Sequence, residues 1–557
     1  MTLRRLAFLA LCGLVALSAL LLAGRAVAAG GLSALDIAWL LVLAGLTPWA
    51  ALSCGNGLVG LAILLFTPRP AAHVVPALRD PEGPPRTRTV IGVCVRNEDM
   101  AQVIPPLERL LDGLPAPHFD LWFLSDSTEG PHAEAEEIAI VALRARRPAD
   151  AARIHLRRRA VNTGFKAGNV MEFLEAEGRD YDHLLCLDAD SEMSPTAVRT
   201  LVATMEASPR IAILQQLIVG RPVTAAFPRL FQFGMRAGMR AWSTGQGWWQ
   251  AEKGPYWGHN ALIRVAPFRD HGRLEALPDG RAILSHDQVE AVRLHEAGWE
   301  VWCVPEEAGS LEGNPPALPE FLARDLRWAE GNMQYWSLLA APGLTLMARW
   351  QLLQAVLLFL CAPLWVLAFA LAGLIAATGG FDAAPTALLV AVFVTFWALP
   401  AASKLAGYVQ VLAQGGPAVT YGGRGRFLRG ALAELLFALL LAPIRAVHQT
   451  GFLLALPFGL RMGWKPQNRA DRGVSWADAA RLLWPHTLLG ALALLAVAAT
   501  APWALWFALP WVGGLVLAIP FCVWTTAPGA GRWLRARGLA ATPEEVQAES
   551  RAGSRLA

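Results

Sequence analysis

Long apolar runs lie at both ends of the chain, and a polar block of about 280 residues separates them. A membrane span needs about 20 mostly apolar residues. Six runs meet this length: Leu6–Ala23, Ala34–Phe66, Gln351–Ala377, Thr386–Leu412, Trp484–Ala501 and Trp503–Thr525. The first follows a basic start, as in a signal peptide, but the second run comes at once and favours a retained helix. The pattern predicts a bundle of transmembrane helices joined to a polar domain.

A seventh apolar run, Ala431–Leu460, is interrupted by Pro443, Arg445 and His448. Basic residues flank it on both sides: Arg424, Arg426, Arg429, Arg461, Lys465 and Arg469. Basic residues favour the cytoplasmic side of a membrane. If both flanks are cytoplasmic, this run forms a re-entrant or interfacial hairpin, or two short spans.

The distribution of basic residues also predicts the orientation of the chain. Arg4 and Arg5 place the start inside, two spans return the chain inside, and the basic tail ends inside as well. The polar block is then cytoplasmic. Four parts are expected: an N-terminal transmembrane pair (1–67), a cytoplasmic domain (68–347), C-terminal transmembrane and interfacial helices (348–528), and a cytoplasmic tail (529–557).

Within the polar block, short apolar runs alternate with helical patterns. The expected strands are Thr89–Val95, Phe119–Ser125, His183–Ala189 and Ile211–Val219, and helices are expected at 133–147 and Thr196–Ala207. Strands alternating with helices predict an α/β domain with a mostly parallel sheet covered on both faces. Ligands of such sheets bind beyond the carboxyl ends of the strands.

Composition narrows the class of protein. The chain is 55% hydrophobic and 17% charged, against about 25% charged in soluble proteins, which supports a membrane protein. The net charge of +4 and the absence of a basic stripe exclude nucleic acid as a partner. Seven cysteines without C-x-x-C spacing indicate neither a zinc ribbon nor a disulfide framework. The G-x-G-x-x-G match at Gly55–Gly60 lies in an apolar run, where packing of helices through small residues explains it better than dinucleotide binding.

Two acids end the apolar stretch "LLCLDADSEMSP", and they raise the question of what offsets their repulsion. Asp188 and Asp190 are separated by one alanine. Such carboxylates raise each other's pKa unless a metal ion, a basic side chain or water lies close. A D-x-D at a strand end can hold a divalent cation. Asp126 follows another predicted strand. The alternative is that these acids are turn and N-cap residues.

Other polar residues in the block have the chemistry to accompany these acids. Lys166 and Gly168 are expected in a loop just before a helix, where an ammonium and close backbone suit a phosphate. Asp287 begins an amphipathic helix, as a general base or as a first-turn acid favoured by the helix dipole. Three candidates lie near one face of a further helix, which could also be a plain surface helix: Arg324, Arg327 and Trp328.

Tryptophans and ionisable residues in apolar runs are further candidates. Flat rings stack on sugars but also mark membrane interfaces; the three in question are Trp248, Trp249 and Trp257. Ionisable groups in apolar helices usually face a protein interior or a wet path, or else snorkel to the interface; here they are Lys404, Glu434 and Arg445.

Five motifs occur in a fixed order: D-S at Asp126, K-A-G-N at Lys166–Asn169, D-A-D at Asp188–Asp190, S-H-D ending at Asp287 and R-D-L-R-W at Arg324–Trp328. In these motifs, roughly from Ile91 to Gly463, the chain resembles the processive family 2 glycosyltransferases, such as cellulose and hyaluronan synthases. The stretches "YWGHNALIRV", "ILSHDQVEA" and "GSLEGNPPALPEFLARDLRW" resemble the subgroup that makes bacterial osmoregulated periplasmic glucans. Arg324 departs from the usual Q-x-x-R-W, as this subgroup does.

The resemblance implies a GT-A fold, a UDP-glucose donor, inversion at the anomeric carbon and a growing β-glucan, β-1,2-linked. By motif match, Asp126 binds the uridine, Lys166 and Asp188 lie at the diphosphate, and Asp190 with Asp188 holds Mg²⁺ or Mn²⁺. Asp287 is the catalytic base. The remaining matched residues bind substrate: His259, Asn260, Arg324, Arg327 and Trp328.

The resemblance further implies a multi-pass protein of the bacterial inner membrane that passes its glucan across the bilayer. Acyl carrier protein and periplasmic glucan-processing proteins are implied partners. The motifs fit synthesis of a cellulose- or chitin-like polymer almost as well. A glucan transporter or sensor with an inactive transferase domain is a third possibility, which the presence of all the expected acids argues against.

Overall fold

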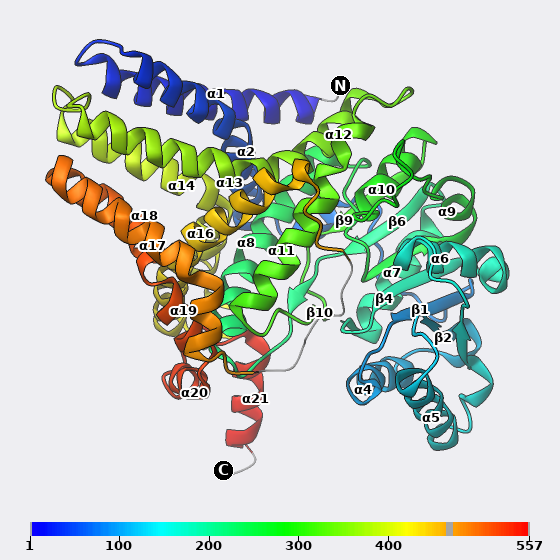
Figure 1. The fold of residues 1–557 in the computed structure, drawn as a ribbon. Coiled ribbons are helices and arrows are strands. Elements are labelled where there is room, and N and C mark those ends of the chain that lie inside the picture. Colours follow the sequence, from blue (N-terminus) through cyan, green and yellow to red (C-terminus); the bar gives the residue numbers. More distant parts are fainter. Residues whose placement is uncertain (1–2, 464–471, 555–557) are drawn as a thin grey trace.

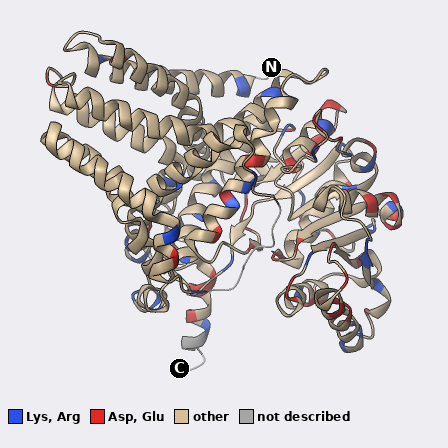
Figure 2. Ribbon diagram, in the orientation of Figure 1, with Lys and Arg blue, Asp and Glu red and all other residues tan. Residues whose placement is uncertain are grey.

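The computed structural model describes residues 3–463 and 472–554 (Figure 1). Long apolar helices project to one side of the molecule, and the main sheet with its covering helices lies on the other. Charged residues are concentrated on the sheet side of the molecule and where this side meets the apolar helices (Figure 2). The projecting parts of the apolar helices contain almost none. Lys465 and Arg469 of the predicted basic flank lie outside the described residues.

The main sheet has seven strands in the order β3-β2-β1-β4-β8-β6-β9. Its strands are β1 (Thr89–Val95), β2 (Phe119–Ser125), β3 (Ile154–Arg158), β4 (His183–Asp188), β6 (Ile211–Gln216), β8 (Ala261–Arg264) and β9 (Glu300–Val304). Strand β8 is antiparallel to both of its neighbours, and the other pairs are parallel. The predicted first two strands have the observed bounds. The inserted antiparallel strand was not predicted.

Helices on both faces cover this sheet, and a small second sheet lies at its edge. The helices are α4 (Met100–Asp112), α5 (Pro131–Arg146), α6 (Phe165–Glu175), α7 (Pro195–Ala207), α9 (Val265–His271) and α10 (Asp287–Glu296). The small sheet has the order β5-β10-β7, with β5 (Glu192–Met193), β7 (Val219–Gly220) and β10 (Ser310–Glu312). The run predicted as one strand, Ile211–Val219, is therefore divided between β6 and β7.

Three amphipathic helices lie outside the sheet layers and the long apolar helices: α8 (Ala226–Gln250), α11 (Leu318–Met333) and α20 (Pro528–Ala536). Four further helices are α3 (Pro70–Val74), α12 (Tyr335–Leu338), α15 (Gly415–Thr420) and α21 (Pro543–Ser554). Helix α8 packs against α2, α14 and α16. Its glutamines, arginines and tryptophans are mostly buried between these helices and the sheet.

Six described helices are long and apolar enough to cross a membrane, and a bent pair makes a seventh if it is one span. They are α1 (Leu3–Ala28), α2 (Ala34–Phe66), α13 (Leu346–Ala377), α14 (Thr386–Ala413), α16 (Arg424–Ala455), α17 (Trp476–Thr500), and the pair α18 (Leu505–Val516) and α19 (Ala518–Thr526). The pair is bent by 59°. Helices α1, α13 and α17 each end in a short connection to the next helix. Apolar residues near these connections, around Val27, Ile375 and Ala501, pack together at the end of the helices far from the sheet (Figure 1).

Helix α16 corrects the expectation for the interrupted seventh run. It is one continuous helix through Pro443, and not a hairpin or two short spans. Near its start, Arg426 pairs with Glu549 of α21 at 2.7 Å. Just past its end, the backbone N–H of Met462 donates to Glu330 of α11 at 2.8 Å. Both ends of α16 therefore contact helices outside the apolar bundle, α21 near its start and α11 past its end.

The glycines of the Gly55–Gly60 motif allow close helix contacts, which confirms their predicted packing role. A Cβ added at Gly60 would lie 1.9 Å from the carbonyl oxygen of Ala241 in α8. A Cβ at Gly57 would lie 2.9 Å from the backbone of Ser403 in α14. Only glycine lets the three backbones approach this closely.

The ionisable residues of the apolar helices are paired with one another or with the polar domain. Lys404 Nζ lies 2.5 Å from Glu434 Oε1, and the Tyr408 hydroxyl donates to the other carboxylate oxygen. Arg445 forms an ion pair of 2.9 Å with Asp325 of α11. These pairs tie helices together and do not require snorkelling.

Candidate functional site

Lys166 and Asp188 meet beyond the carboxyl ends of β1 and β4. Lys166 lies in the first turn of α6, which begins at Phe165, so the expectation that it lies in the preceding loop was wrong. Its ammonium donates to Asp188 Oδ1, and to the carbonyl of Gly258 at 2.8 Å. Burial lowers the pKa of Lys166, but the charge and hydrogen bond of Asp188, together with Cys186 and Cys94, raise it, for a net upward shift that favours the protonated amine. A basic side chain therefore offsets one of the two adjacent carboxylates.

His259 extends the cluster on the other side of Asp188. Its Nδ1 lies 3.3 Å from Ser191 Oγ, which accepts from the N–H of Asp188, and its Nε2 lies 3.4 Å from Glu312. Burial opposes the charged imidazole, but the carboxylates of Asp188 and Glu312 raise the pKa of His259 to about 9. His259 is thus a cation between two acids at neutral pH.

Helix α11 closes the site from the membrane side. Arg324 is 8% exposed, and its guanidinium carbon lies 4.5 Å from the ring centroid of Trp328. Burial lowers the pKa of Arg324, and the carboxylates of Glu312, Asp325 and Asp190 act against that shift. Its Nε has no hydrogen-bond partner among the described residues. A buried cation with an unused donor, beside acids of the site, suits an anionic substrate group.

Asp287 begins α10 on the opposite wall, as predicted. Gly258 brings the two walls together, because a Cβ there would lie 3.5 Å from the Cβ of Asp287. The backbone of Gly258 has φ +89°, which glycine adopts without strain. The carbonyl of Gly258 accepts from Lys166, so Lys166 and Asp287 both lie next to this residue.

The neighbours of Asp287 adjust its proton affinity. Burial raises the pKa of its carboxyl group, the His286 cation lowers it, and Glu290 raises it, for a net upward shift. His286 Nδ1 lies 2.9 Å from Glu290 Oε2. Burial opposes charge on His286, but Glu290 raises its pKa to about 9. A carboxylate with a raised pKa accepts a proton more readily, as a general base requires.

Asp126 follows β2 at the same edge of the sheet. Arg159 holds its carboxylate with two contacts, at 2.5 Å and 3.1 Å, and also donates to the carbonyls of Thr163 and Phe165. The side chain of Arg159 is 2% exposed. This buried arginine joins Asp126 to the loop before Lys166.

The remaining predicted residues occupy less direct positions. Asn260 is fully buried with φ +49°, and it donates to Ser310 and Leu311 of β10, so its predicted substrate contact stays a prediction. Arg327 is half-buried on α11, beside exposed Trp328. Among the tryptophan candidates, Trp249 is excluded as a sugar platform, because it is 3% exposed and stacks on Phe8.

Sequence reasoning missed several partners in the site: Arg159, Ser191, Gly258, His286 and Glu312. Glu312 and His286 lie inside quoted motifs and could have been singled out as charged residues next to candidates. Arg159 is one of three consecutive arginines, and nothing in the sequence distinguishes it from Arg157 and Arg158. Only the register of β2 and β3 shows which of them reaches Asp126.

The residues fit a divalent cation that shares its ligands with a substrate. The described residues contain no group of three His, Cys, Asp or Glu side chains arranged as a metal site. Magnesium commonly uses one or two carboxylates and takes its other ligands from phosphates and water. Asp190 lies close to the backbone of Gly313, since a Cβ added there would lie 3.0 Å from Asp190 Oδ2.

Comparisons with known proteins identify the family. Residues 90–272 match the model described as glycosyl transferase family 2, and residues 183–402 match glycosyl transferase family group 2. Glucans biosynthesis glucosyltransferase H of Bradyrhizobium diazoefficiens is 33% identical over 544 residues, covering 92% of this chain and 71% of that protein. The Vibrio cholerae protein of the same name is 32% identical, covering 93% of this chain and 74% of that protein. The chain belongs to the glucans biosynthesis glucosyltransferase H family.

Membership confirms the predicted GT-A α/β domain with transmembrane helices, in a family 2 glucosyltransferase of glucan synthesis. The chain spans little more than half of the Pseudomonas putida relative, which it matches at 35% identity over 83% of this chain and 56% of that protein. Mannosyltransferase PcManGT from Pyrobaculum calidifontis, solved with GDP-Man and Mn²⁺, has a TM-score of 0.42 at 16% identity, over 65% of this chain and 99% of that chain.

Proposed function

We propose that this glucosyltransferase elongates a β-1,2-linked periplasmic glucan from UDP-glucose, with inversion, and passes the product across the bacterial inner membrane. The supporting observation is the line of contacts from Lys166 and Asp188 through Gly258 to Asp287. The Lys166 cation and the Asp188 carboxylate lie on one side of Gly258. The Asp287 carboxyl group, whose pKa is raised, lies on the other side. An inverting transfer needs such a pair of sides and no covalent nucleophile.

The residues divide the work between leaving group and acceptor. Lys166, Arg324 and Arg327 orient and neutralise the diphosphate, while Asp126 binds the uridine part through the position that Arg159 fixes. Asp287 takes the proton from the acceptor hydroxyl. His286 favours the ionised form of Asp287, because its cation lowers the pKa that burial raises.

Asp190 and Asp188 would hold Mg²⁺ or Mn²⁺ through their carboxylate oxygens. A bound divalent cation supplies charge neutralisation to the departing nucleoside diphosphate. Asp188 is then shared between that ion and Lys166. Trp328, which is 49% exposed on α11, offers a flat ring to the acceptor sugar.

Purified protein incubated with labelled UDP-sugars in turn, followed by linkage sequencing of the product, tests the proposal. We expect β-1,2-linked glucan from UDP-glucose and loss of synthesis in excess EDTA. Turnover of UDP-N-acetylglucosamine but not UDP-glucose would favour a chitin-like synthase, and β-1,4 linkage a cellulose-like one. Absence of transfer from every donor, with intact folding, would favour the transporter or sensor. Acyl carrier protein and periplasmic processing proteins as partners stay predictions.

A further inference from the structure

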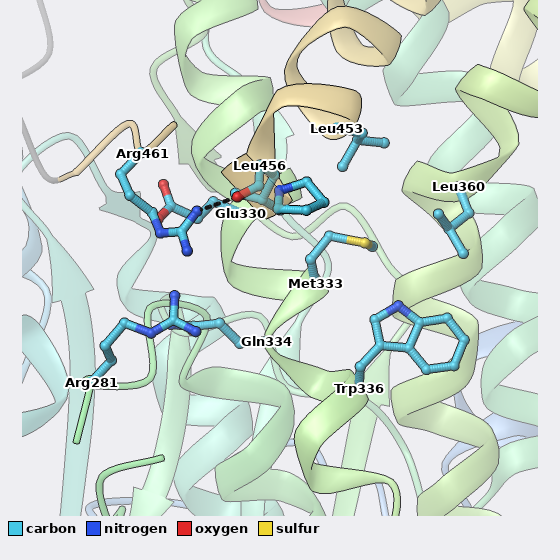
Figure 3. Close-up of a pocket in the computed structure, with 10 residues that line it drawn as sticks. Arg281, Glu330, Met333, Gln334, Trp336, Leu360, Leu453, Leu456 and Arg461 are labelled. Atoms are coloured by element: carbon cyan, nitrogen blue, oxygen red, sulfur yellow. Dashed lines mark hydrogen bonds and ion pairs between the residues drawn. The ribbon is translucent and has the colours of Figure 1, made fainter. Parts of the chain in front are cut away.

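A cavity of about 360 Å³ lies where the polar domain meets the apolar helices (Figure 3). Its walls come from α11, α12, α13 and the end of α16, with Arg281 of the loop that leads to Asp287. One part of the lining is apolar: Met333, Trp336, Leu360, Leu453, Leu456 and Pro457. The other part is polar: Arg281, Glu330, Gln334 and Arg461.

The two arginines face each other at the polar end. Figure 3 shows a terminal nitrogen of each guanidinium directed toward the other. Arg461 donates to the carbonyls of Leu456 and Leu460 at 2.7 Å and 2.8 Å and lies 3.7 Å from Glu330. Arg281 pairs with exposed Asp279 at 2.6 Å. Each cation is thus held in place with a carboxylate beside it, Asp279 for Arg281 and Glu330 for Arg461. The terminal nitrogens directed into the space between the two guanidinium groups can donate charge-assisted hydrogen bonds to an anion there.

The apolar end is lined by helices that are candidate membrane spans. Leu360 belongs to α13 and Leu453 to α16. Exposed apolar residues are close in sequence to this lining, on α12, at the end of α16 and just past it: Trp336, Leu454, Phe458 and Leu460. Tryptophan at such a place is typical of the boundary between headgroups and acyl chains. The cavity therefore continues the apolar surface of the bundle.

We propose that this cavity binds an anionic phospholipid, with its phosphate between Arg281 and Arg461 and an acyl chain along Met333, Leu360 and Leu453. A soluble phosphate would use only the polar end and leave the apolar wall in water. An amphiphile with one negative headgroup matches both ends. Basic pockets between membrane helices bind anionic headgroups by the same chemistry.

The cavity wall also holds the loop that positions Asp287. Gln334 accepts from the N–H of Leu284 at 2.8 Å and donates to the carbonyl of Ala282 at 3.1 Å. Tyr335 donates to the carbonyl of Ser285 at 2.7 Å. A lipid that fixes Arg281 and Gln334 would restrict residues 281–287. The bound lipid then orders the catalytic loop, which is a step that a structural readout can test without measuring synthesis.

Binding of radiolabelled phosphatidylglycerol to the full chain in neutral detergent tests the site. We expect one saturable site, with affinity reduced at least tenfold in the R281Q/R461Q double variant and in L453W, which fills the apolar end. The matched control is R481Q/R535Q, because it removes two exposed arginines elsewhere, one of them paired with Asp478 as Arg281 is with Asp279. The control should change the affinity less than twofold. Unchanged binding in R281Q/R461Q, or an equal loss in the control, would overturn the proposal.

Two further arms separate the possible sources of the phosphate and test the coupling. Inorganic phosphate should not displace the lipid at equal concentration. If inorganic phosphate displaced the lipid, and did so equally well in L453W, the cavity would be a site for a soluble anion. That result would overturn the lipid assignment. Hydrogen exchange at residues 281–287 should slow when phosphatidylglycerol is added to the native chain but not to R281Q/R461Q. Exchange that is unaffected by lipid would overturn the coupling to the Asp287 loop.

Discussion

The carboxylate of Asp188 has a positive partner within the chain itself. Lys166 reaches it from the first turn of α6, and His259 lies on its other side. The pair Asp188 and Asp190 is therefore not a site of uncompensated repulsion. The cations that stabilise it in the ligand-free chain are the same type of group that a diphosphate requires.

Replacing Asp287 by asparagine tests its role as the base. The substitution keeps the size and the helix-start position but cannot accept the acceptor proton. We expect glucan synthesis to fall by about 10²- to 10⁴-fold, which is the usual effect of losing a positioned base. UDP affinity, measured by calorimetry, should change little, because Lys166 and Arg324 remain. Near-full synthesis by Asp287→Asn would make Asp287 only a first-turn acid, and Glu290 the next residue to test.

The effect of His286 on Asp287 predicts a change in the pH profile. A base acts only when ionised, so the rate falls as pH drops through the pKa of Asp287. The His286 cation lowers the pKa of Asp287. Removing that cation also removes the ion-pair partner of Glu290, whose negative charge raises the pKa of Asp287. We expect His286→Gln to move the acidic limb of the kcat/KM profile to higher pH by about one unit. This is the lower end of the pKa shift that a nearby charge usually causes. A limb that stays in place or moves down contradicts this assignment.

Asp126 and Asp188 were predictable from sequence, whereas Arg159 and Glu312 were not. Asp126 and Asp188 end apolar runs, so a strand followed by an acid was readable from the pattern alone. Arg159 and Glu312 reach the site from other elements through strand register and the small sheet. Asn260 shows the converse, since it lies within a motif but its side chain braces β10. Long-range pairing of this kind leaves no periodic signal in one sequence.

At the scale of elements, the closest helix contacts depend on glycines. Helix α8 lies against α2 and α14, with Gly60 on Ala241, Gly245 on Asn56, and Gly407 on Ala237. In each case an added Cβ would lie about 2 Å from a carbonyl oxygen. Helix α8 thus joins the polar domain to the apolar bundle through backbone contacts that admit no side chain.

Gly60→Ala tests this joint. The new methyl would meet the carbonyl of Ala241 at 1.9 Å, so α2 and α8 must separate. We expect a loss of stability of about 1–3 kcal/mol, as for overpacking of a close-packed interior. It should appear as a lower thermal midpoint of the purified protein. Gly13→Ala in α1 is the control, because its Cβ would meet nothing within 4 Å. Equal midpoints for Gly60→Ala and Gly13→Ala would contradict the contact.

The predicted helices and strands were right where one hydrophobic period dominated the sequence. They were wrong where an apolar run also contained a residue that usually breaks the element. The alternating block gave β1 and β2 with their observed bounds. Helix α16 was expected to break at Pro443, yet it continues, because Arg445 and Gln449 bind Asp325 and its neighbours pack on α8 and α18. Tertiary contacts compensate for the hydrogen bond that proline removes. Strand β8 was missed because its four residues are too few to show a period.

At the scale of the whole molecule, the tail and the sheet lie on one side of the apolar bundle. Arg236 of α8 pairs with Glu307, just after β9, and with Glu544 of α21, at 2.6 Å and 2.7 Å. Arg229 adds a buried contact of 2.6 Å to Glu545. If α16 lies along the interface, the other candidate spans with the bent pair number six, and an even number returns the chain to its starting side.

We therefore expect the polar domain and the tail to be cytoplasmic, and the turns between paired spans to be periplasmic. A membrane-impermeant thiol reagent applied to intact spheroplasts tests this. Glu134→Cys on exposed α5 should be labelled only after lysis, since Glu134 lies on the sheet side. Leu32→Cys, 59% exposed between α1 and α2, should be labelled without lysis. The native chain sets the background, because its seven cysteines are buried or half-buried. Labelling of Glu134→Cys in intact spheroplasts would invert the topology and place the site away from cytoplasmic nucleotide sugars.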